Sequence, residues 1–142
     1  MKIYKIGIIG CGGIAQKMAA TLEKMKGVER YAVASRNQEK AEAFANKWGF
    51  TKAYGSYEEL ASDPEVDLIY IATPHAMHYD NAHMCIEKGK PVLCEKAFTA
   101  NARQAEDLLA FAKEKGVFIT EAIWTRYMPL SLKIQELLKE GV

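Results

Sequence analysis

The sequence predicts an α/β fold with a doubly wound parallel sheet, in a single domain over residues 1–142. Short apolar runs alternate with helical patterns along the whole chain, as parallel strands joined by crossover helices require. A glycine-rich turn, Gly10-Cys11-Gly12-Gly13-Ile14-Ala15, separates the first apolar run from the first helical pattern. A chain of 142 residues has the length of one ordinary domain.

The first half of the chain supplies three predicted strands and two predicted helices. Strands are expected at residues 5–9, 31–34 and 52–54, and the first is a short apolar run that Gly10 ends. The first helix presents one apolar face, formed by Ile14, Met18, Leu22 and Met25, and Gly27 is expected to stop it. A second helix, residues 38–48, ends before Gly49.

The second half continues the alternation. Strands are expected at 68–72, 92–94 and 117–120, with one helix at 77–88 and another that carries Ala105, Leu108, Leu109 and Ala112 at helical spacing. Thr99 or Asn101 can cap the second of these helices, and Gly116 ends it. The apolar stripe of a last helix consists of Leu130, Ile134, Leu137 and Leu138. Right-handed crossovers then predict the strand order 3-2-1-4-5-6, with ligands bound beyond the carboxyl ends of the strands.

Composition excludes several classes of protein. The formal net charge is +1 and the basic residues are dispersed, so nothing indicates nucleic acid or an anionic membrane as a partner. No apolar run approaches the roughly 20 residues that span a bilayer. The three cysteines, Cys11, Cys85 and Cys94, lack the paired spacing of zinc or redox motifs, which favours a reducing, cytoplasmic setting.

The glycine-rich turn has the spacing and context of the Rossmann dinucleotide fingerprint, with alanine at its third small position. Gly10 permits the tight turn, Gly12 lets the backbone approach a pyrophosphate, and Ala15 allows close packing of helix and sheet. Gly13 and Ile14 would present N–H donors to the anion. The alternative is that these residues form a tight strand-to-helix turn and nothing more.

The residues after the second strand indicate which nicotinamide cofactor is used. An acidic residue there would hold the ribose hydroxyl of NAD, whereas this chain has Ser35 and Arg36. A hydroxyl and a guanidinium both bind phosphate, so NADP is favoured over NAD. The alternative for Arg36 is an ordinary solvated arginine. A methyltransferase would also require an acidic residue at this position.

Polar residues follow the fourth and fifth strands at the same edge of the sheet. Thr73, Pro74 and His75 are expected to meet the ribose and nicotinamide, unless they form a plain turn. Lys96, after Cys94 and Glu95, would point its ammonium toward the reacting oxygen, unless it is only a salt-bridge partner of Glu95.

The three histidines raise the question of a metal site. His78 and His83 are five positions apart, about 140° around a helix, and no further ligand completes a tetrahedral set. We therefore expect no metal.

Three motifs occur together in order: Gly10-x-Gly12-x-x-Ala15, Ala72-Thr73-Pro74-x-x-x-His78 and Glu95-Lys96. With them the chain resembles the Gfo/Idh/MocA oxidoreductases across its whole length. The stretch from Glu121 to Pro129 is similar to the dihydrodiol dehydrogenase branch of that family.

The resemblance implies hydride transfer at nicotinamide C4, with a sugar, polyol or trans-diol as the small-molecule substrate. It assigns the active-site lysine to Lys96 and implies that Glu95, His78, Trp124 and Arg126 lie near the cofactor. One departure is Ala97, where the family usually has proline, which loosens the turn that aims Lys96.

The other departure is length, because the family's C-terminal α+β domain is absent from this chain. We expect a piece of a longer enzyme, a candidate homo-oligomer at full length, that binds cofactor but turns over poorly by itself. The competing interpretation is a module that binds or senses NADP(H) without catalysis.

Overall fold

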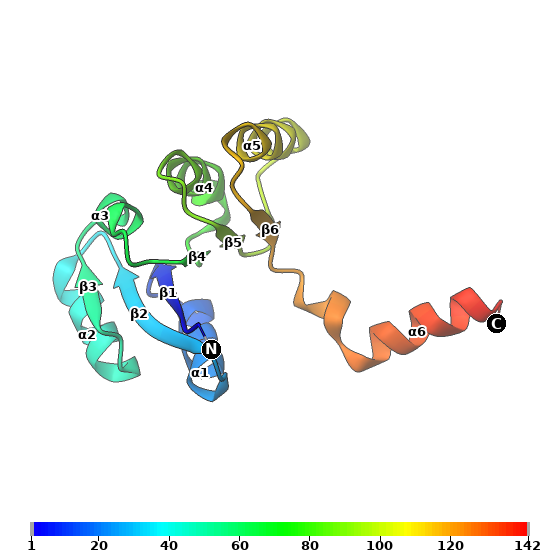
Figure 1. Cartoon of the computed structure of the whole chain (residues 1–142), viewed down its shortest axis with the longest axis horizontal. Coiled ribbons are helices and arrows are strands. Elements are labelled where there is room, and N and C mark those ends of the chain that lie inside the picture. The colour runs from blue at the N-terminus through cyan, green and yellow to red at the C-terminus, as the bar shows by residue number, and fades with distance from the viewer. Residues whose placement is uncertain (1, 142) are drawn as a thin grey trace.

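A computed structural model describes residues 2–141 and shows one six-stranded parallel sheet (Figure 1). Its strands are β1 (Tyr4–Ile9), β2 (Val28–Ala34), β3 (Lys52–Tyr54), β4 (Leu68–Ile71), β5 (Val92–Cys94) and β6 (Ile119–Glu121). The spatial order is β3-β2-β1-β4-β5-β6, which confirms the predicted doubly wound arrangement. The winding reverses between β1 and β4, so the switch point lies between these two strands.

Helices cover both faces of this sheet (Figure 1). On one face lie α1 (Gly13–Lys24) and α2 (Gln38–Trp48), and on the other lie α3 (Tyr57–Ser62), α4 (His78–Glu87) and α5 (Ala102–Lys115). Each layer has its own apolar core: Ala15, Ala19 and Leu22 of α1 belong to one, and Leu60 and Leu108 to the other. Burial on both faces explains why the strands read as continuous apolar runs.

Several element boundaries differ from the prediction. Strand β2 begins at Val28, because its ladder with β1 already pairs Val28 with Tyr4. Strand β6 runs from Ile119 to Glu121, later than predicted. Helix α1 ends at Lys24 and not at Gly27, which instead adopts a positive φ of 79° in the turn to β2.

The short helix α3 was not predicted, although the sequence carries a signal for it. The Ser56 side chain accepts a hydrogen bond from the Glu59 N–H at 3.2 Å and thereby caps the helix. Serine followed three residues later by glutamate is the capping-box pattern. Of the two candidate caps of α5, Asn101 accepts from Gln104 N–H at 3.0 Å, whereas the Thr99 hydroxyl donates to the Asn101 carbonyl.

The end of the described chain departs from the layered body. A 3-10 turn, η2 (Trp124–Tyr127), leads into α6 (Pro129–Glu140), which projects away from the sheet (Figure 1). The predicted apolar stripe therefore remains solvent-exposed, with Leu130 and Leu138 more than two-thirds accessible. Among the described helices, none combines the length and apolar character needed to cross a bilayer.

Candidate functional site

The glycine-rich turn joins the end of β1 to the start of α1 beside the switch point. Gly10 adopts a φ of 101°, and a Cβ there would meet the Ala72 carbonyl oxygen at 2.9 Å. Its N–H donates to the Ala34 carbonyl oxygen at 2.9 Å. Both the left-handed backbone and the close approach require glycine at this position.

The next two glycines leave the helix N-terminus open. Gly12 is the N-cap of α1, and a Cβ added to Gly12 or Gly13 would meet no atom within 4 Å. Among the residues that the structure describes, no side chain caps this helix, so its first N–H groups are free to bind an anion. Ala15 is fully buried against the sheet, as its proposed packing role requires, and Ile14 is partly exposed beside the turn.

Ser35 and Arg36 follow β2 at the same edge. Ser35 is mostly buried, with its N–H bonded to the Tyr54 carbonyl oxygen and its Oγ accepting from the Asn37 N–H. Arg36 is exposed and lies close to Tyr57. Burial raises the pKa of the Tyr57 hydroxyl, and the positive charge of Arg36 opposes that rise. The Arg36 guanidinium and the Tyr57 hydroxyl therefore lie near each other, and the Tyr57 hydroxyl also lies near Cys11 of the glycine-rich turn.

Thr73, Pro74 and His75 follow β4. Thr73 is buried, and its hydroxyl oxygen accepts a hydrogen bond from Asn81 Nδ2 at 3.0 Å. Pro74 is exposed, and His75 is exposed at the start of the 3-10 turn η1 (His75–Met77). The helix predicted at 77–88 is α4 (His78–Glu87), and η1 precedes it and ends at Met77.

His78 does not face an open surface. Its ring is fully buried, with Nδ1 2.7 Å from the Ala97 carbonyl oxygen and Nε2 2.9 Å from the Thr73 carbonyl oxygen. Both ring nitrogens are occupied by backbone carbonyl oxygens, and the placement of His78 near the cofactor stays a prediction. His78 joins the backbone of the two loops that carry Thr73 and Lys96.

Glu95 and Lys96 follow β5 and occupy different environments. The Glu95 carboxylate is buried and accepts a 2.6 Å hydrogen bond from the Tyr70 hydroxyl, while its other oxygen accepts from Lys96 N–H. Burial, together with this bond to Glu95, raises the pKa of Tyr70 far above its ordinary value. Lys96 is exposed, and within the described chain it forms no ion pair with Glu95. The salt-bridge alternative is thus wrong, and the Lys96 ammonium remains available.

These loops line adjoining cavities. One of about 130 Å³ is lined by Ile14, Thr73, His75, Glu95 and Lys96. A larger one of about 440 Å³ shares Ile14 and Glu95 with it and extends to Trp124. We call the two together the edge trough.

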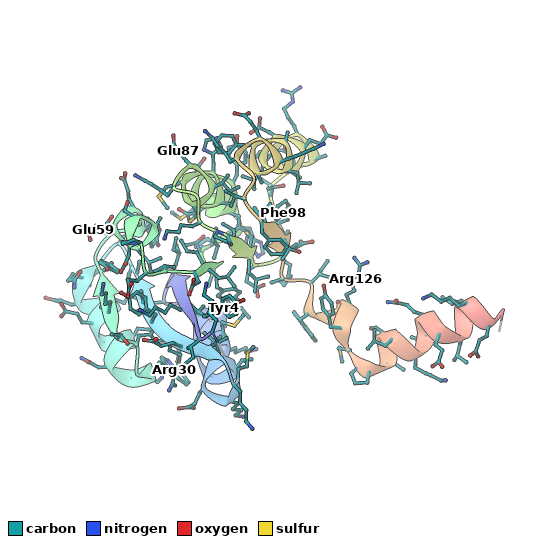
Figure 2. All side chains as sticks on the ribbon, viewed as in Figure 1. Tyr4, Arg30, Glu59, Glu87, Phe98 and Arg126 are labelled. Carbon is teal, nitrogen blue, oxygen red and sulfur yellow. The ribbon has the colours of Figure 1, made fainter. Side chains whose placement is uncertain are left out.

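Trp124 and Arg126, both in η2, lie in different surroundings. Trp124 is 59% exposed, lines the edge trough, and also lines an apolar cavity of about 240 Å³ over β5 and β6. Arg126 lies on η2 toward the projecting helix (Figure 2), and it lines neither cavity of the trough. The structure therefore does not bring Arg126 to the other predicted residues.

The remaining histidine packs against an aromatic ring. His83 stacks on Phe111 of α5, with ring centroids 4.1 Å apart and planes within 3°. Over residues 2–141, the His, Cys, Asp and Glu side chains form no cluster of three that could hold a metal ion.

Residues 4–122 match the Gfo/Idh/MocA family, which is described as an oxidoreductase family with an NAD-binding Rossmann fold. The chain belongs to this family. The match confirms the family that the motifs had indicated, and it covers every strand of the sheet.

Named relatives agree with the dihydrodiol dehydrogenase resemblance. The chain is 46% identical to the D-xylose 1-dehydrogenase (NADP(+)) of Hypocrea jecorina, over 96% of this chain and 38% of that protein. It is 43% identical to the trans-1,2-dihydrobenzene-1,2-diol dehydrogenase of Mus musculus, over 95% of this chain and 41% of that protein. The chain thus spans about two fifths of the length of these relatives.

Solved structures share the fold closely. An NAD binding oxidoreductase from Klebsiella pneumoniae superposes with a TM-score of 0.92 at 33% identity, covering 98% of this chain and 39% of the other. The 3-ketoreductase KijD10 of Actinomadura kijaniata, in complex with TDP-benzene and NADP, gives a TM-score of 0.91 at 31% identity, covering 99% and 45% respectively.

Proposed function

We propose that this chain is the NADP(H)-binding domain of an oxidoreductase that acts on a hydroxyl-bearing carbon of a sugar, polyol or trans-diol. The single observation that carries the proposal is the open glycine turn at the N-terminus of α1, beside Ser35 and Arg36. The D-xylose 1-dehydrogenase (NADP(+)) and the trans-1,2-dihydrobenzene-1,2-diol dehydrogenase among its relatives support the substrate class. Because the chain matches about two fifths of these relatives, we expect a second domain to complete the substrate pocket.

The residues present fit a dinucleotide. The space in front of Gly12 and Gly13 is free of protein atoms within 4 Å of an added Cβ, so a pyrophosphate can approach the backbone. The same space would be lost to any larger side chain. We assign the pyrophosphate to the N–H groups of Gly13 and Ile14, and the ribose and nicotinamide to the loop of Thr73, Pro74 and His75.

Ser35 and Arg36 would select NADP over NAD. Neither position carries a carboxylate, which would repel a 2′-phosphate. The Arg36 guanidinium is exposed and can form charge-assisted hydrogen bonds to phosphate oxygens.

Lys96 would donate or accept the proton of the reaction. NADP(H), when bound, supplies or accepts the hydride. The Lys96 Nζ is free of an ion-pair partner among the described residues, so it can hydrogen-bond the reacting oxygen and exchange its proton. Glu95, buried and bonded to both Tyr70 and the Lys96 N–H, would hold the lysine backbone in place.

A fluorescence titration with NADPH and with NADH tests the cofactor assignment. We expect tighter binding of NADPH, and we expect Arg36→Ala to weaken NADPH binding about tenfold through the loss of charged hydrogen bonds. The same variant should leave NADH binding unchanged. Equal affinity of the unmodified chain for both nucleotides would overturn the assignment to NADP.

Lys96→Ala separates an enzyme from a module that only senses NADP(H). In the longer protein, we expect this variant to retain NADPH binding and to lose at least about 100-fold in oxidation of a diol or sugar. Unchanged turnover would refute the role of Lys96. Absence of turnover in the unmodified protein with sugars, polyols and diols would favour the sensor.

We also propose a cytoplasmic location. Cys11, Cys85 and Cys94 are all free thiols, which is typical of a reducing compartment.

A further inference from the structure

The loop that carries Lys96 leaves β5 at the carboxyl edge of the sheet, and we call residues 96–98 the Lys96 loop. Within the described chain, the backbone groups of this loop form hydrogen bonds with side chains. These side chains belong to Glu95, His78, Cys94 and Glu121. The direction of the loop, and with it the place of the Lys96 ammonium, therefore depends on side-chain contacts.

Glu121 is the contact that comes from the neighbouring strand. It is the last residue of β6, and the ladder pairs it with Cys94, the last residue of β5. Its Oε1 accepts a hydrogen bond from the Phe98 N–H at 2.9 Å, across 23 positions of the chain. Phe98 lies beside β6 (Figure 2). The Glu121 carboxylate thus ties the Lys96 loop to the end of β6.

Glu121 and Cys94 together bind both backbone groups of Phe98. The Cys94 Sγ donates to the Phe98 carbonyl oxygen at 3.7 Å, while Glu121 accepts from the N–H. Burial raises the pKa of the Cys94 thiol to about 12, and the negative charges of Glu121 and Glu95 add to this rise, so the thiol keeps the proton that it donates. A hydrogen bond to a carboxylate is charge-assisted and stronger than a neutral one, so Glu121 makes the stronger of the two contacts.

The other side chains bind the earlier residues of the loop. Glu95 accepts from the Lys96 N–H, and the His78 ring contacts the Ala97 carbonyl oxygen. Ala97 itself adds no restraint, because alanine, unlike proline, does not fix φ. Without Glu121, the Phe98 N–H would lose its acceptor and the end of the loop would be free to turn about Ala97.

We propose that Glu121 is a positioning residue, which fixes the Lys96 loop to the end of β6 and so sets where the Lys96 ammonium lies in the edge trough. Its own carbonyl oxygen accepts a hydrogen bond from the Ile123 N–H at 2.9 Å, in the turn that leads to Trp124. One residue thus joins the Lys96 side of the trough to its Trp124 side. The effect on catalysis rests on the proposed function, whereas the hydrogen bond to Phe98 does not.

Amide hydrogen exchange in this chain tests the hydrogen bond. Because an amide loses protection when its acceptor is removed, we expect Glu121→Ala to speed exchange of the Phe98 N–H about tenfold. Glu121→Gln keeps a side-chain oxygen as acceptor, so it should speed exchange by about threefold at most. The matched control is Glu23→Ala, which removes an exposed carboxylate near the end of α1 and should leave the Phe98 rate unchanged.

The amides of the central strands separate a local effect from a global one. We expect the slowly exchanging amides of β1 and β4 to keep their rates in Glu121→Ala. An unchanged Phe98 rate in that variant would overturn the proposal. An equal increase at Phe98 and in β1 would also overturn it, because such a change reports a loss of global stability.

Kinetics of the longer protein test the consequence for Lys96. We expect Glu121→Ala to lower kcat about tenfold while NADPH affinity changes less than about twofold, because the phosphates bind at the glycine-rich turn and not at this loop. Glu121→Gln should restore most of kcat. An equal loss of kcat in both variants, or a loss of NADPH affinity with kcat unchanged, would refute the positioning role. If the unmodified protein neither binds NADPH nor turns over, the proposed function fails and the catalytic role with it, while the Phe98 exchange rate decides the hydrogen bond separately.

Discussion

The two ends of the sheet use polar groups in opposite ways. At the amino end, Asp63 accepts hydrogen bonds from Lys52, Tyr54 and Tyr31, and the buried Lys90 ammonium donates to the carbonyl oxygens of Asp63 and Val66. At the carboxyl end, the first N–H groups of α1 have no side-chain cap, and Arg36 and Lys96 are exposed cations without an ion-pair partner in the described chain.

The polar groups at the amino end stabilise the fold, whereas those at the carboxyl end are left free to bind a ligand. Polar groups that satisfy each other stabilise the fold, because burial without a partner costs free energy. Groups that are to bind a ligand must keep their donors free until it arrives, and they contribute little to folding. The carboxyl end combines both, since the loops that carry Thr73 and Lys96 are braced by buried hydrogen bonds from Asn81, His78 and Tyr70.

The largest expected effect on stability is that of Gly10→Ala, and Gly12→Ala is its matched comparison. At Gly10 the left-handed φ and the 2.9 Å approach to Ala72 should lower the free energy of unfolding by about 2–4 kcal/mol. At Gly12 a methyl group meets no protein atom, so stability should be unchanged while NADPH binding weakens at least about tenfold. Urea unfolding and fluorescence titration measure the two effects. Equal stability of the two variants would contradict the comparison.

Asp63→Asn should destabilise the protein by about 2 kcal/mol, through loss of charge-assisted hydrogen bonds at the amino end. Burial opposes ionisation of Asp63, but hydrogen bonds from Tyr54 and Lys52 outweigh it and hold the pKa of this carboxyl far below its usual value. A lowered folded-state pKa gives stability that is complete above the unfolded value of about 3.9 and is lost as pH falls further.

The unmodified chain should therefore lose stability below about pH 4, and Asp63→Asn should lose less over that range. Thermal unfolding from pH 7 to pH 2 measures both curves. NADPH affinity at pH 7 should be the same for the two proteins, because the amino end lies away from the trough. A weakened affinity in a folded Asp63→Asn protein would show that the two ends are coupled.

Tyr70→Phe should have the smallest effect on stability, a loss of about 1–2 kcal/mol from the buried hydrogen bond to Glu95. In the longer enzyme, turnover should fall while NADPH affinity changes less, since Glu95 holds the backbone of Lys96 rather than the phosphates. Denaturant unfolding and steady-state kinetics measure these effects. A larger change in NADPH affinity than in turnover would place Tyr70 at the binding end of the trough.

The sequence was sufficient for the fold and for half of the site. Short apolar runs between helical patterns predicted six strands and their order, because crossover handedness leaves few arrangements for such a pattern. The glycine spacing predicted the turn at Gly10. Because Ser35, Thr73 and Lys96 each follow a parallel strand, their positions in the sequence predicted that all three lie at the carboxyl edge of the sheet. These signals are local, or follow from topology rules that act on local elements.

The partners of those residues emerged only in three dimensions. Tyr70 lies 25 positions before Glu95, and His78 lies 19 positions before Ala97, so no periodic pattern connects them. A tyrosine in an apolar strand and an asparagine on a buried helix face did signal that polar partners were needed, but not which ones.

Residues 4–9 and 28–34 form adjacent strands. Apolar side chains and turn glycines specify each of these strands locally, in the order of the chain. Which hydroxyl meets which carboxylate, that the His78 ring bridges two loops, and that α6 projects with its leucines exposed depend on how separate elements pack. Distances between such elements arise from the packing of the whole sheet and its helices, and no single segment encodes them.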